Sequence, residues 1–230
     1  MATVVQRLLR SNLAWRLSGL TLPTAILATS GRVRTVSDYL DLTRRQMKLL
    51  SSQVEFKGHV LEFGSGLGGN LIAIRDRLID GIGLDINRSF LSHARALARI
   101  AGASNLQFVE FDGHVFPFPE RSFDCIFSIG VFERLPRSRV RQYVTSFSGL
   151  LKPGGVCALY FLSDIAMATT FSNLLGRDAY VTWRPDEVTG LVKGTAFSII
   201  ESFPWGAARR VGSSERASIA QVYVLRRTDN

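Results

Sequence analysis

The sequence predicts an α/β fold with a doubly wound, seven-stranded sheet that ends in an antiparallel hairpin. From Gly58 onward, apolar strand segments alternate with amphipathic helical segments, which is typical of parallel strands joined by crossover helices. The last two apolar segments, residues 197–203 and 220–227, have no helix between them and should pair antiparallel. We therefore assign residues 55–230 to one sheet domain and residues 1–54 to amino-terminal cap helices.

Two helical patterns precede the first strand. Apolar side chains recur at helical spacing over residues 5–20, although Arg16 interrupts that face. A second and more regular stripe covers residues 36–50, with Thr35 or Ser37 available as its N-cap. A proline and a glycine between the two patterns are expected to break the chain.

The sheet itself follows from five apolar segments that alternate with helical ones. The expected parallel strands cover residues 59–64, 81–86, 106–111, 123–129 and 156–162. Helical patterns extend to about Leu78 after the first strand, then over residues 88–101 and about 138–150. The KPGG segment before the fifth strand predicts a turn, and Pro185 is expected to open a short helix.

Composition excludes several classes of protein. Hydrophobic residues make up 46% of the chain and charged residues 20%, which is typical of a globular domain. Cys125 and Cys157 each lie within an apolar strand segment and are too few for a disulfide framework, so we expect a cytoplasmic setting. Because no uncharged apolar run reaches the roughly 18 residues that a membrane-spanning helix needs, an integral membrane protein is not expected.

The net charge of +9 is unevenly distributed, since residues 1–37 hold five arginines and no acid. Such a terminus is found in targeting peptides, in membrane-surface helices, in nucleic-acid contacts and in simple caps on a fold. Peripheral membrane association through the first helix is therefore one open alternative. The sequence gives no indication of the oligomeric state.

A glycine-rich turn follows the first strand and marks the candidate ligand site. Its residues, GSGLGG, fit both GxGxxG and GxGxG, patterns in which the backbone approaches a nucleotide closely. Glu62 precedes this turn, Asp85 ends the second strand and Asp112 follows the third, beside Gly113. A carboxylate at Glu62 would repel a pyrophosphate, and one at Asp85 can accept both hydroxyls of a ribose. Three acids at three successive strand ends favour a cationic adenosine ligand.

In this order, LEFGSGLGGN, GLDI, the segment from Asp112 to SFD, and LLKPGG resemble the class I S-adenosylmethionine-dependent methyltransferases, which have a Rossmann-like sheet. The resemblance covers about residues 55–226 and implies S-adenosylmethionine as the cofactor. It implies that the glycine turn contacts the methionine end, that Asp85 holds the ribose, and that Asp112 and Gly113 hold the adenine. The cofactor-binding residues predicted in this way are Glu62, Gly64, Ser65, Gly66, Gly68, Asp85, Ile86, Asp112, Gly113 and Ile129. We predict no metal site.

Two residues are candidates for a general base. Many relatives have E-H-L after the fourth strand, whereas this chain has Glu133-Arg134-Leu135 and so lacks a histidine there. Glu133 is therefore a candidate base, or else a carboxylate that orients the cofactor or caps a helix. His114 in the loop after Asp112 is the second candidate, or an inert surface residue. Tyr39 on the second helix either closes over the cofactor or makes an ordinary core contact.

The substrate is predicted only as a class. Residues 163–184 are rich in alanine, threonine and aromatic side chains, which suits a small, partly apolar molecule methylated on oxygen or carbon better than a nucleic acid. Three alternatives stay open: an RNA methyltransferase, an NAD-dependent oxidoreductase, and a catalytically silent scaffold that binds the cofactor. Glu62 and the terminal hairpin argue against the NAD-dependent enzyme.

Overall fold

We describe the protein from a computed structural model. The structure describes residues 17–30, 33, 35–163, 180–205, 210–211, 214–215 and 220–228. Residues 5–16 of the first predicted helix and most of the predicted substrate segment, residues 164–179, lie outside these residues. The described residues fall into two compact units, one within residues 1–117 and the other within residues 118–163 and 180–228.

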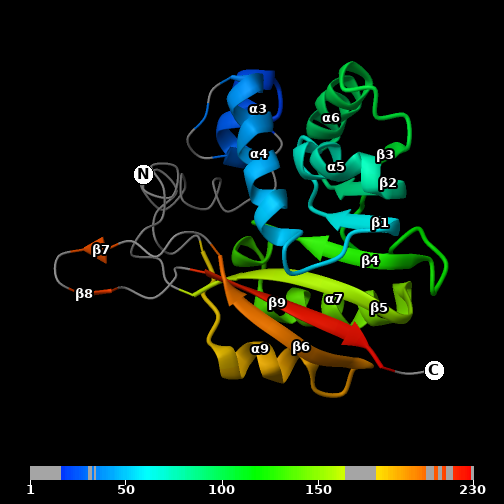
Figure 1. Cartoon of the computed structure of the whole chain (residues 1–230), viewed down its shortest axis with the longest axis vertical. Coiled ribbons are helices and arrows are strands. Elements are labelled where there is room, and N and C mark those ends of the chain that lie inside the picture. Colours follow the sequence, from blue (N-terminus) through cyan, green and yellow to red (C-terminus); the bar gives the residue numbers. More distant parts are fainter. Residues whose placement is uncertain are drawn as a thin grey trace. The chain divides into compact units, whose positions relative to one another are not determined.

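The strands form a seven-stranded sheet in the order β3-β2-β1-β4-β5-β9-β6 (Figure 1). This mixed sheet with flanking helices confirms the predicted α/β class. The elements of the first unit are α3 (Leu22–Ser30), α4 (Val36–Leu50), β1 (Gly58–Phe63), α5 (Gly69–Ile74), the 3-10 helix η1 (Arg75–Arg77), β2 (Leu78–Asp85), α6 (Arg88–Ile100) and β3 (Leu106–Glu110).

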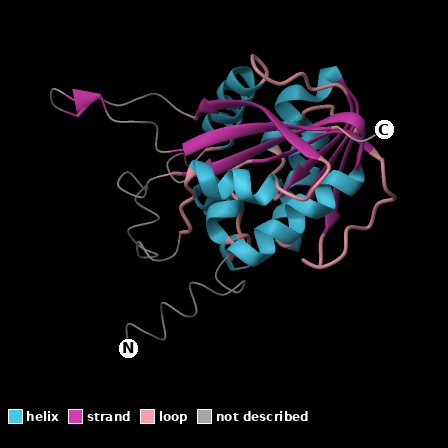
Figure 2. Cartoon of the chain, turned by 90° about the horizontal axis from the view of Figure 1, so that it is seen from below, coloured by secondary structure: helices cyan, strands magenta, loops and turns pink. Residues whose placement is uncertain are grey.

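The second unit contains the remaining four strands of the sheet. Its elements are β4 (Phe123–Ser128), the 3-10 helix η2 (Phe132–Arg134), α7 (Arg137–Leu150), β5 (Leu151–Leu162), α9 (Pro185–Val192), β6 (Phe197–Pro204), β7 (Arg210–Val211), β8 (Ser214–Glu215) and β9 (Ala220–Arg227). Strands β7 and β8 form a separate two-stranded sheet, visible as the small magenta arrow of Figure 2.

Strand direction agrees with the prediction in both units. In the first unit, β1 and β3 both pair parallel to β2. In the second unit, β4 pairs parallel to β5, and β9 pairs antiparallel to both β5 and β6. The predicted antiparallel terminal pairing is therefore confirmed. Because parallel strands end at the same edge of a sheet, the residues that follow β1, β2 and β3 share one edge of the first unit.

Each unit buries its own apolar side chains. In the first unit, the consecutive residues Val60 and Leu61 of β1, and Leu84 and Asp85 of β2, are buried, so both faces of β1 and β2 are covered. In the second unit, Phe127 and Phe147 are fully buried, and α7 contacts β5. Cys125 and Cys157 are buried and free, as their apolar segments predicted.

The KPGG segment differs from its prediction as a turn. Strand β5 begins at Leu151, before this segment, and the pairing jumps from Phe123 opposite Leu151 to Cys125 opposite Val156. The extra residues on β5 make an irregularity in the ladder, and Gly154 has a φ of 74° within it. A glycine is favoured there because a left-handed backbone costs it no Cβ clash. The chain therefore bulges inside a strand instead of turning before one.

Helix α3 was missed because Pro23 suggested a break. A proline in the first turn of a helix is tolerated, since the N–H groups there have no partner within the helix. Pro23 is the second residue of α3, and the helix buries Ala25, Ile26 and Ala28.

Helix α4 matches its predicted bounds, and the structure settles which residue caps it. The Thr35 hydroxyl accepts a hydrogen bond from the Asp38 amide at 3.1 Å, while Ser37 lies exposed inside the first turn. We predict that Thr35→Ala lowers the free energy of unfolding by about 1 kcal/mol, because an amide at the helix start loses its acceptor. Ser37→Ala is the matched control, and urea denaturation of both variants is the measurement. Equal losses for the two variants would contradict this assignment.

Candidate active site

The glycine turn after β1 adopts backbone angles that glycine accommodates. Gly64, Gly66 and Gly68 have φ values of 75°, 52° and 72°, in the left-handed region. A Cβ on Gly68 would lie 2.4 Å from Cε1 of Phe108, so the turn also packs too closely for a side chain there. Gly68 directly precedes α5, whose first amides therefore face the turn. The turn is thus shaped for close approach of the backbone to a ligand.

Asp85 fixes this turn from the end of β2. Its side chain is only 5% exposed, and its Oδ2 accepts a hydrogen bond from the Gly66 amide at 2.9 Å. Its Oδ1 accepts from the Asn87 amide at 2.8 Å, and Asn87 in turn caps α6. A carboxylate has about four acceptor positions, so one such side chain can accept more than the bonds from two backbone amides. The sequence predicted the ribose contact but not this structural role.

Glu62 is the second buried acid of the site. Its side chain is 2% exposed, and its Oε1 accepts a hydrogen bond from Nδ2 of Asn70 at 2.8 Å. Among the described residues, its Oε2 has no hydrogen-bond partner. Burial is the main reason that the pKa of Glu62 is raised to about 8; the bond from Asn70 and the Leu71 amide act to lower it, and the charge of Asp85 acts to raise it. A buried acceptor without a partner, next to a second acid, fits a ligand that carries positive charge.

Helices α3 and α4 pack onto the glycine turn. The Tyr39 hydroxyl, from α4, accepts a hydrogen bond from the Gly69 amide at 3.2 Å, and Tyr39 is buried. A Cβ on Gly66 would lie 3.1 Å from the methyl group of Thr29, on α3. Tyr39 therefore makes a core contact that also supports the start of α5. The division into cap and sheet domains stays a prediction, since both helices belong to the first compact unit.

The third acid lies in an exposed loop. Asp112 follows β3, and its Oδ1 accepts hydrogen bonds from the amides of His114 and Val115 at 2.7 and 3.1 Å. These bonds lower the pKa of Asp112. Phe116 anchors the loop by stacking on Phe111, with ring centroids 4.7 Å apart.

Gly113, with a φ of 86°, leaves the backbone accessible at the turn. His114 is exposed, and its role as a base stays a prediction.

The structure brings most of the predicted cofactor residues together in the first unit. Ile86, half-buried, follows Asp85 directly at the end of β2. Ile129 and Glu133 belong to the second unit, where they follow β4. Asn70 and Asn87 were not predicted. Both could have been found from their position one or two residues after a glycine turn or a strand-end acid, where a side-chain amide satisfies buried polar groups.

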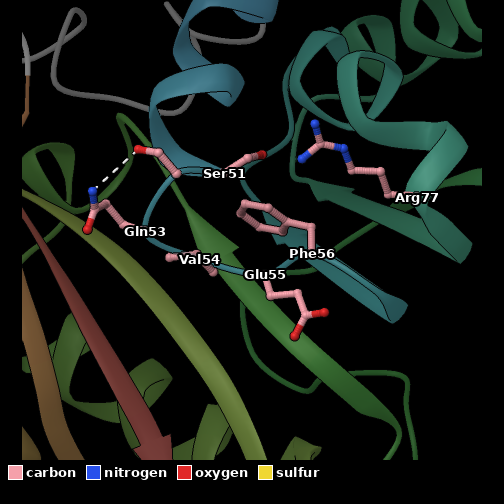
Figure 3. A pocket seen from close by; sticks show the side chains of 7 residues that line it. Ser51, Gln53, Val54, Glu55, Phe56 and Arg77 are labelled. Atoms are coloured by element: carbon pink, nitrogen blue, oxygen red, sulfur yellow. Dashed lines mark hydrogen bonds between the residues drawn. The ribbon is translucent and has the colours of Figure 1, made fainter.

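A pocket of about 500 Å³ lies elsewhere in the first unit (Figure 3). It is lined by residues 51–56 and Arg77, which precede β1 and β2. It therefore lies near the amino ends of these strands, whereas the glycine turn follows their carboxyl ends. Glu55 in this pocket is exposed and pairs with Lys57 at 2.8 Å. None of the predicted site residues lines it.

Comparison with known proteins points to one kind of domain. Residues 60–155 match the family model described as a methyltransferase domain, and this range holds most of β1, the glycine turn, Asp85 and Glu133. Within this range the chain is similar to the class I S-adenosylmethionine-dependent methyltransferases. The match spans the acids and the turn described above, and it leaves both ends of the chain uncovered.

Two curated relatives are similar in sequence to part of this chain. A fatty-acid O-methyltransferase from Mycolicibacterium smegmatis is 33% identical over 133 residues, which are 55% of this chain and 45% of that enzyme. A sterol 24-C-methyltransferase from Gibberella zeae is 30% identical over 112 residues, 46% of this chain and 28% of that enzyme. The chain therefore spans less than half the length of either relative.

Solved structures share the fold. The PH0226 protein from Pyrococcus horikoshii superposes with a TM-score of 0.65 at 19% identity, covering 84% of this chain and 93% of that one. At this identity the likeness supports the fold and not the activity. It confirms the α/β fold with its seven-stranded sheet and antiparallel terminal hairpin.

We predict that Asp85→Ala weakens binding of S-adenosylmethionine to this chain at least tenfold. The variant removes both the proposed ribose contact and the acceptor that holds the Gly66 amide, each a charge-assisted bond worth about 1.5 to 3 kcal/mol. Isothermal titration calorimetry measures the affinity. Glu110→Gln is the control, because Glu110 lies opposite Asp85 on β3 but is exposed and pairs with Arg88. Unchanged affinity in Asp85→Ala would overturn the assignment.

We further predict that the ligand-free protein loses stability between pH 5 and pH 8 through Glu62. Because its folded pKa of about 8 exceeds the ordinary glutamate value, the protonated form favours folding. That stability is fully present below the unfolded pKa and is lost as the pH rises through about 8. Glu62→Gln should therefore show a smaller decrease in unfolding free energy over this range, measured by urea denaturation. Glu110→Gln should behave like the parent; a Glu62→Gln profile parallel to the parent would refute the prediction.

Proposed function

We propose that this chain transfers a methyl group from S-adenosylmethionine to an oxygen or carbon of a small, partly apolar molecule. One observation carries the proposal: two buried acids, Glu62 and Asp85, flank a glycine turn, and one oxygen of Glu62 has no partner among the described residues. Buried carboxylates are costly unless they meet a positive group or hydrogen-bond donors. A cationic adenosine cofactor supplies both.

The chain's own residues would hold the cofactor as follows. Glu62 would accept a hydrogen bond from the ammonium group, and Asp85 from the ribose hydroxyls. Asp112 and Gly113 would bind the adenine edge, with the backbone of Gly64, Ser65 and Gly66 against the methionine end. When bound, S-adenosylmethionine supplies a methyl group that its sulfonium has already activated. The protein must then align the acceptor and exclude water, and such positioning lowers a barrier by roughly 7 to 11 kcal/mol.

The acceptor class has support from two directions. The curated relatives are named for fatty-acid and sterol methylation, and both substrates are largely apolar. In the described part of the second unit, Tyr160 and Trp205 are in edge-to-face contact, with ring centroids 6.2 Å apart, and both are only half-buried. Such aromatic side chains suit an apolar acceptor. Nucleic acid is not the partner that we propose, although an RNA substrate is the first alternative to test.

Buried Glu62 argues against the NAD-dependent alternative, because its carboxylate would face the pyrophosphate.

No described helix is both long and apolar enough to cross a membrane. We propose a cytoplasmic enzyme. We keep as a proposal that the basic residues before Val36 allow contact with a membrane surface, where an apolar acceptor would be found.

The proposal is tested with the full chain in two steps. Thermal-shift assays first compare S-adenosylmethionine with NAD, with Glu62→Gln as the variant and Glu110→Gln as its control. Methyl transfer from labelled S-adenosylmethionine is then followed by mass spectrometry over alcohols, phenols, fatty acids, sterols and RNA. Stabilisation by S-adenosylmethionine but not by NAD, followed by methylation of an apolar acceptor, is expected. Binding without turnover on any acceptor would favour the silent scaffold, and stabilisation by NAD alone would refute the proposal.

A further inference from the structure

The second unit gathers four side chains at the carboxyl ends of β4 and β5, which we call the acceptor cluster: Glu133, Arg134, Tyr160 and Tyr180. Glu133 and Arg134 lie in η2, which follows β4. Tyr160 lies near the end of β5. Because β4 and β5 are parallel, with Ser128 opposite Leu159, the residues that follow β4 and those that end β5 share one edge.

Backbone hydrogen bonds bring Tyr180 to the same edge. The Val181 amide donates to the Glu133 carbonyl at 2.7 Å, and the Trp183 amide donates to the Leu162 carbonyl at 2.8 Å. The segment after Tyr180 therefore crosses the ends of both strands. Arg137 holds it there, since its guanidinium donates to the Thr182 carbonyl at 2.7 Å.

Glu133 is the buried polar group of this cluster. Its side chain is 6% exposed, and among the described residues its Oε2 has no hydrogen-bond partner. Burial raises the pKa of Glu133, and the neighbouring charge of Arg134 lowers it only in part. A buried carboxyl oxygen without a partner costs free energy, so its retention calls for a donor that the described residues do not supply.

The side chains of Tyr160 and Tyr180 lie close enough to Glu133 for its charge to affect their pKa values. Burial is the main cause of the raised pKa of Tyr160 and of Tyr180, and the charge of Glu133 raises both further. The guanidinium of Arg134 lies over the Tyr180 ring, with Cζ 5.4 Å from the ring centroid. Part of its positive charge therefore interacts with the ring in a cation–π contact. On the other side, Tyr160 contacts Trp205. The cluster therefore combines one buried acid, two hydroxyl groups and aromatic surface.

We propose that the acceptor cluster binds the hydroxyl group of an apolar alcohol or phenol and that Glu133 accepts its proton. The inference rests on the proposed function and deepens it by naming the acceptor group. The acceptor O–H points at Oε2 of Glu133, and Tyr160 and Tyr180 orient the oxygen. The O–CH₃ bond forms as the sulfonium S–CH₃ bond breaks, and the hydroxyl proton passes to Glu133, which later releases it to water.

A carboxylic acid acceptor fits the cluster less well. A carboxylate is already ionised at neutral pH and needs no base. Placed against Glu133, it would meet a like charge in a buried setting, where repulsion is weakly screened. An alcohol or phenol instead gives Glu133 the donor that it lacks. The structure therefore favours ether formation over ester formation.

The experiment uses the full chain with S-adenosylmethionine and three probes: 4-nonylphenol, 1-dodecanol and dodecanoic acid. The alcohol and the acid have the same chain length, so they differ in the acceptor group alone. Products are identified by mass spectrometry, and cofactor affinity is measured separately by calorimetry. Glu133→Gln tests the base, and Tyr160→Phe tests the orienting hydroxyl. Glu201→Gln, an exposed glutamate on β6, is the matched control.

We expect methyl ethers of the phenol or the alcohol and little methyl ester. Glu133→Gln should lower kcat by about 100-fold with cofactor affinity within a factor of about three, as loss of a general base requires. It should also remove the acidic limb of the kcat profile, which lies above the ordinary glutamate range because the pKa of Glu133 is raised. Tyr160→Phe should raise KM about threefold to tenfold.

Several outcomes would overturn the inference. Ester formation that survives Glu133→Gln would show that the acceptor is a carboxylate. Reduced cofactor affinity in Glu133→Gln with normal saturated turnover would make it a cofactor-orienting residue. If the chain binds S-adenosylmethionine but the two hydroxyl probes neither react nor bind in calorimetry with S-adenosylhomocysteine present, the cluster is not a hydroxyl site. If S-adenosylmethionine itself fails to bind, the proposed function fails first, and the two failures are thereby distinguished.

Discussion

The carboxylate of Asp85 is the interaction on which the candidate cofactor site depends. One oxygen holds the Gly66 amide of the turn after β1, and the other holds the Asn87 amide at the start of α6. The single buried carboxylate at the end of β2 therefore holds both the glycine turn after β1 and the loop that leads into α6. The glycine turn requires such a tie, because a backbone with several left-handed residues is entropically expensive to order. The Gly64 and Ser65 amides add to this anchor, since both donate to the Leu84 carbonyl at 2.8 Å.

This arrangement concentrates negative charge where the protein can least solvate it. Glu62 and Asp85 are both almost completely buried, and the charge of Asp85 contributes to the raised pKa of Glu62. Asn70 relieves one oxygen of Glu62 but leaves the other without a described partner. Sites that bind a cation are expected to store unfavourable energy of this kind, since the ligand then relieves it on binding. Stability and affinity should consequently move in opposite directions when Glu62 is neutralised.

Local patterns predicted the fold better than the site. The stripe of α4, the alternation of strands and helices, and the terminal antiparallel pair follow from periodicity, which depends on neighbours in sequence. The KPGG segment and α3 were misjudged because glycine and proline were taken to end elements, whereas a bulge and a first helical turn both accommodate them. Acids at strand ends were found because strand ends are visible in sequence. The acceptor cluster was only partly foreseen: Glu133 was predicted, but Tyr160 and Tyr180 lie 27 and 47 residues further along, and only the fold brings them to it.

Sequence similarity to the relatives likewise gives limited information about the substrate. Their similarity covers about half of this chain and less than half of each relative, and the matched family region ends at residue 155. Tyr160, Tyr180 and Trp205 all lie beyond that region, so the family match carries no information about them. What the described residues offer the acceptor is a buried acid that lacks a donor, next to aromatic rings. A fatty-acid carboxylate would add a second negative charge to that acid, while a hydroxyl would satisfy it. The charge balance of the acceptor cluster, more than the similarity to a fatty-acid enzyme, should therefore decide which oxygen is methylated.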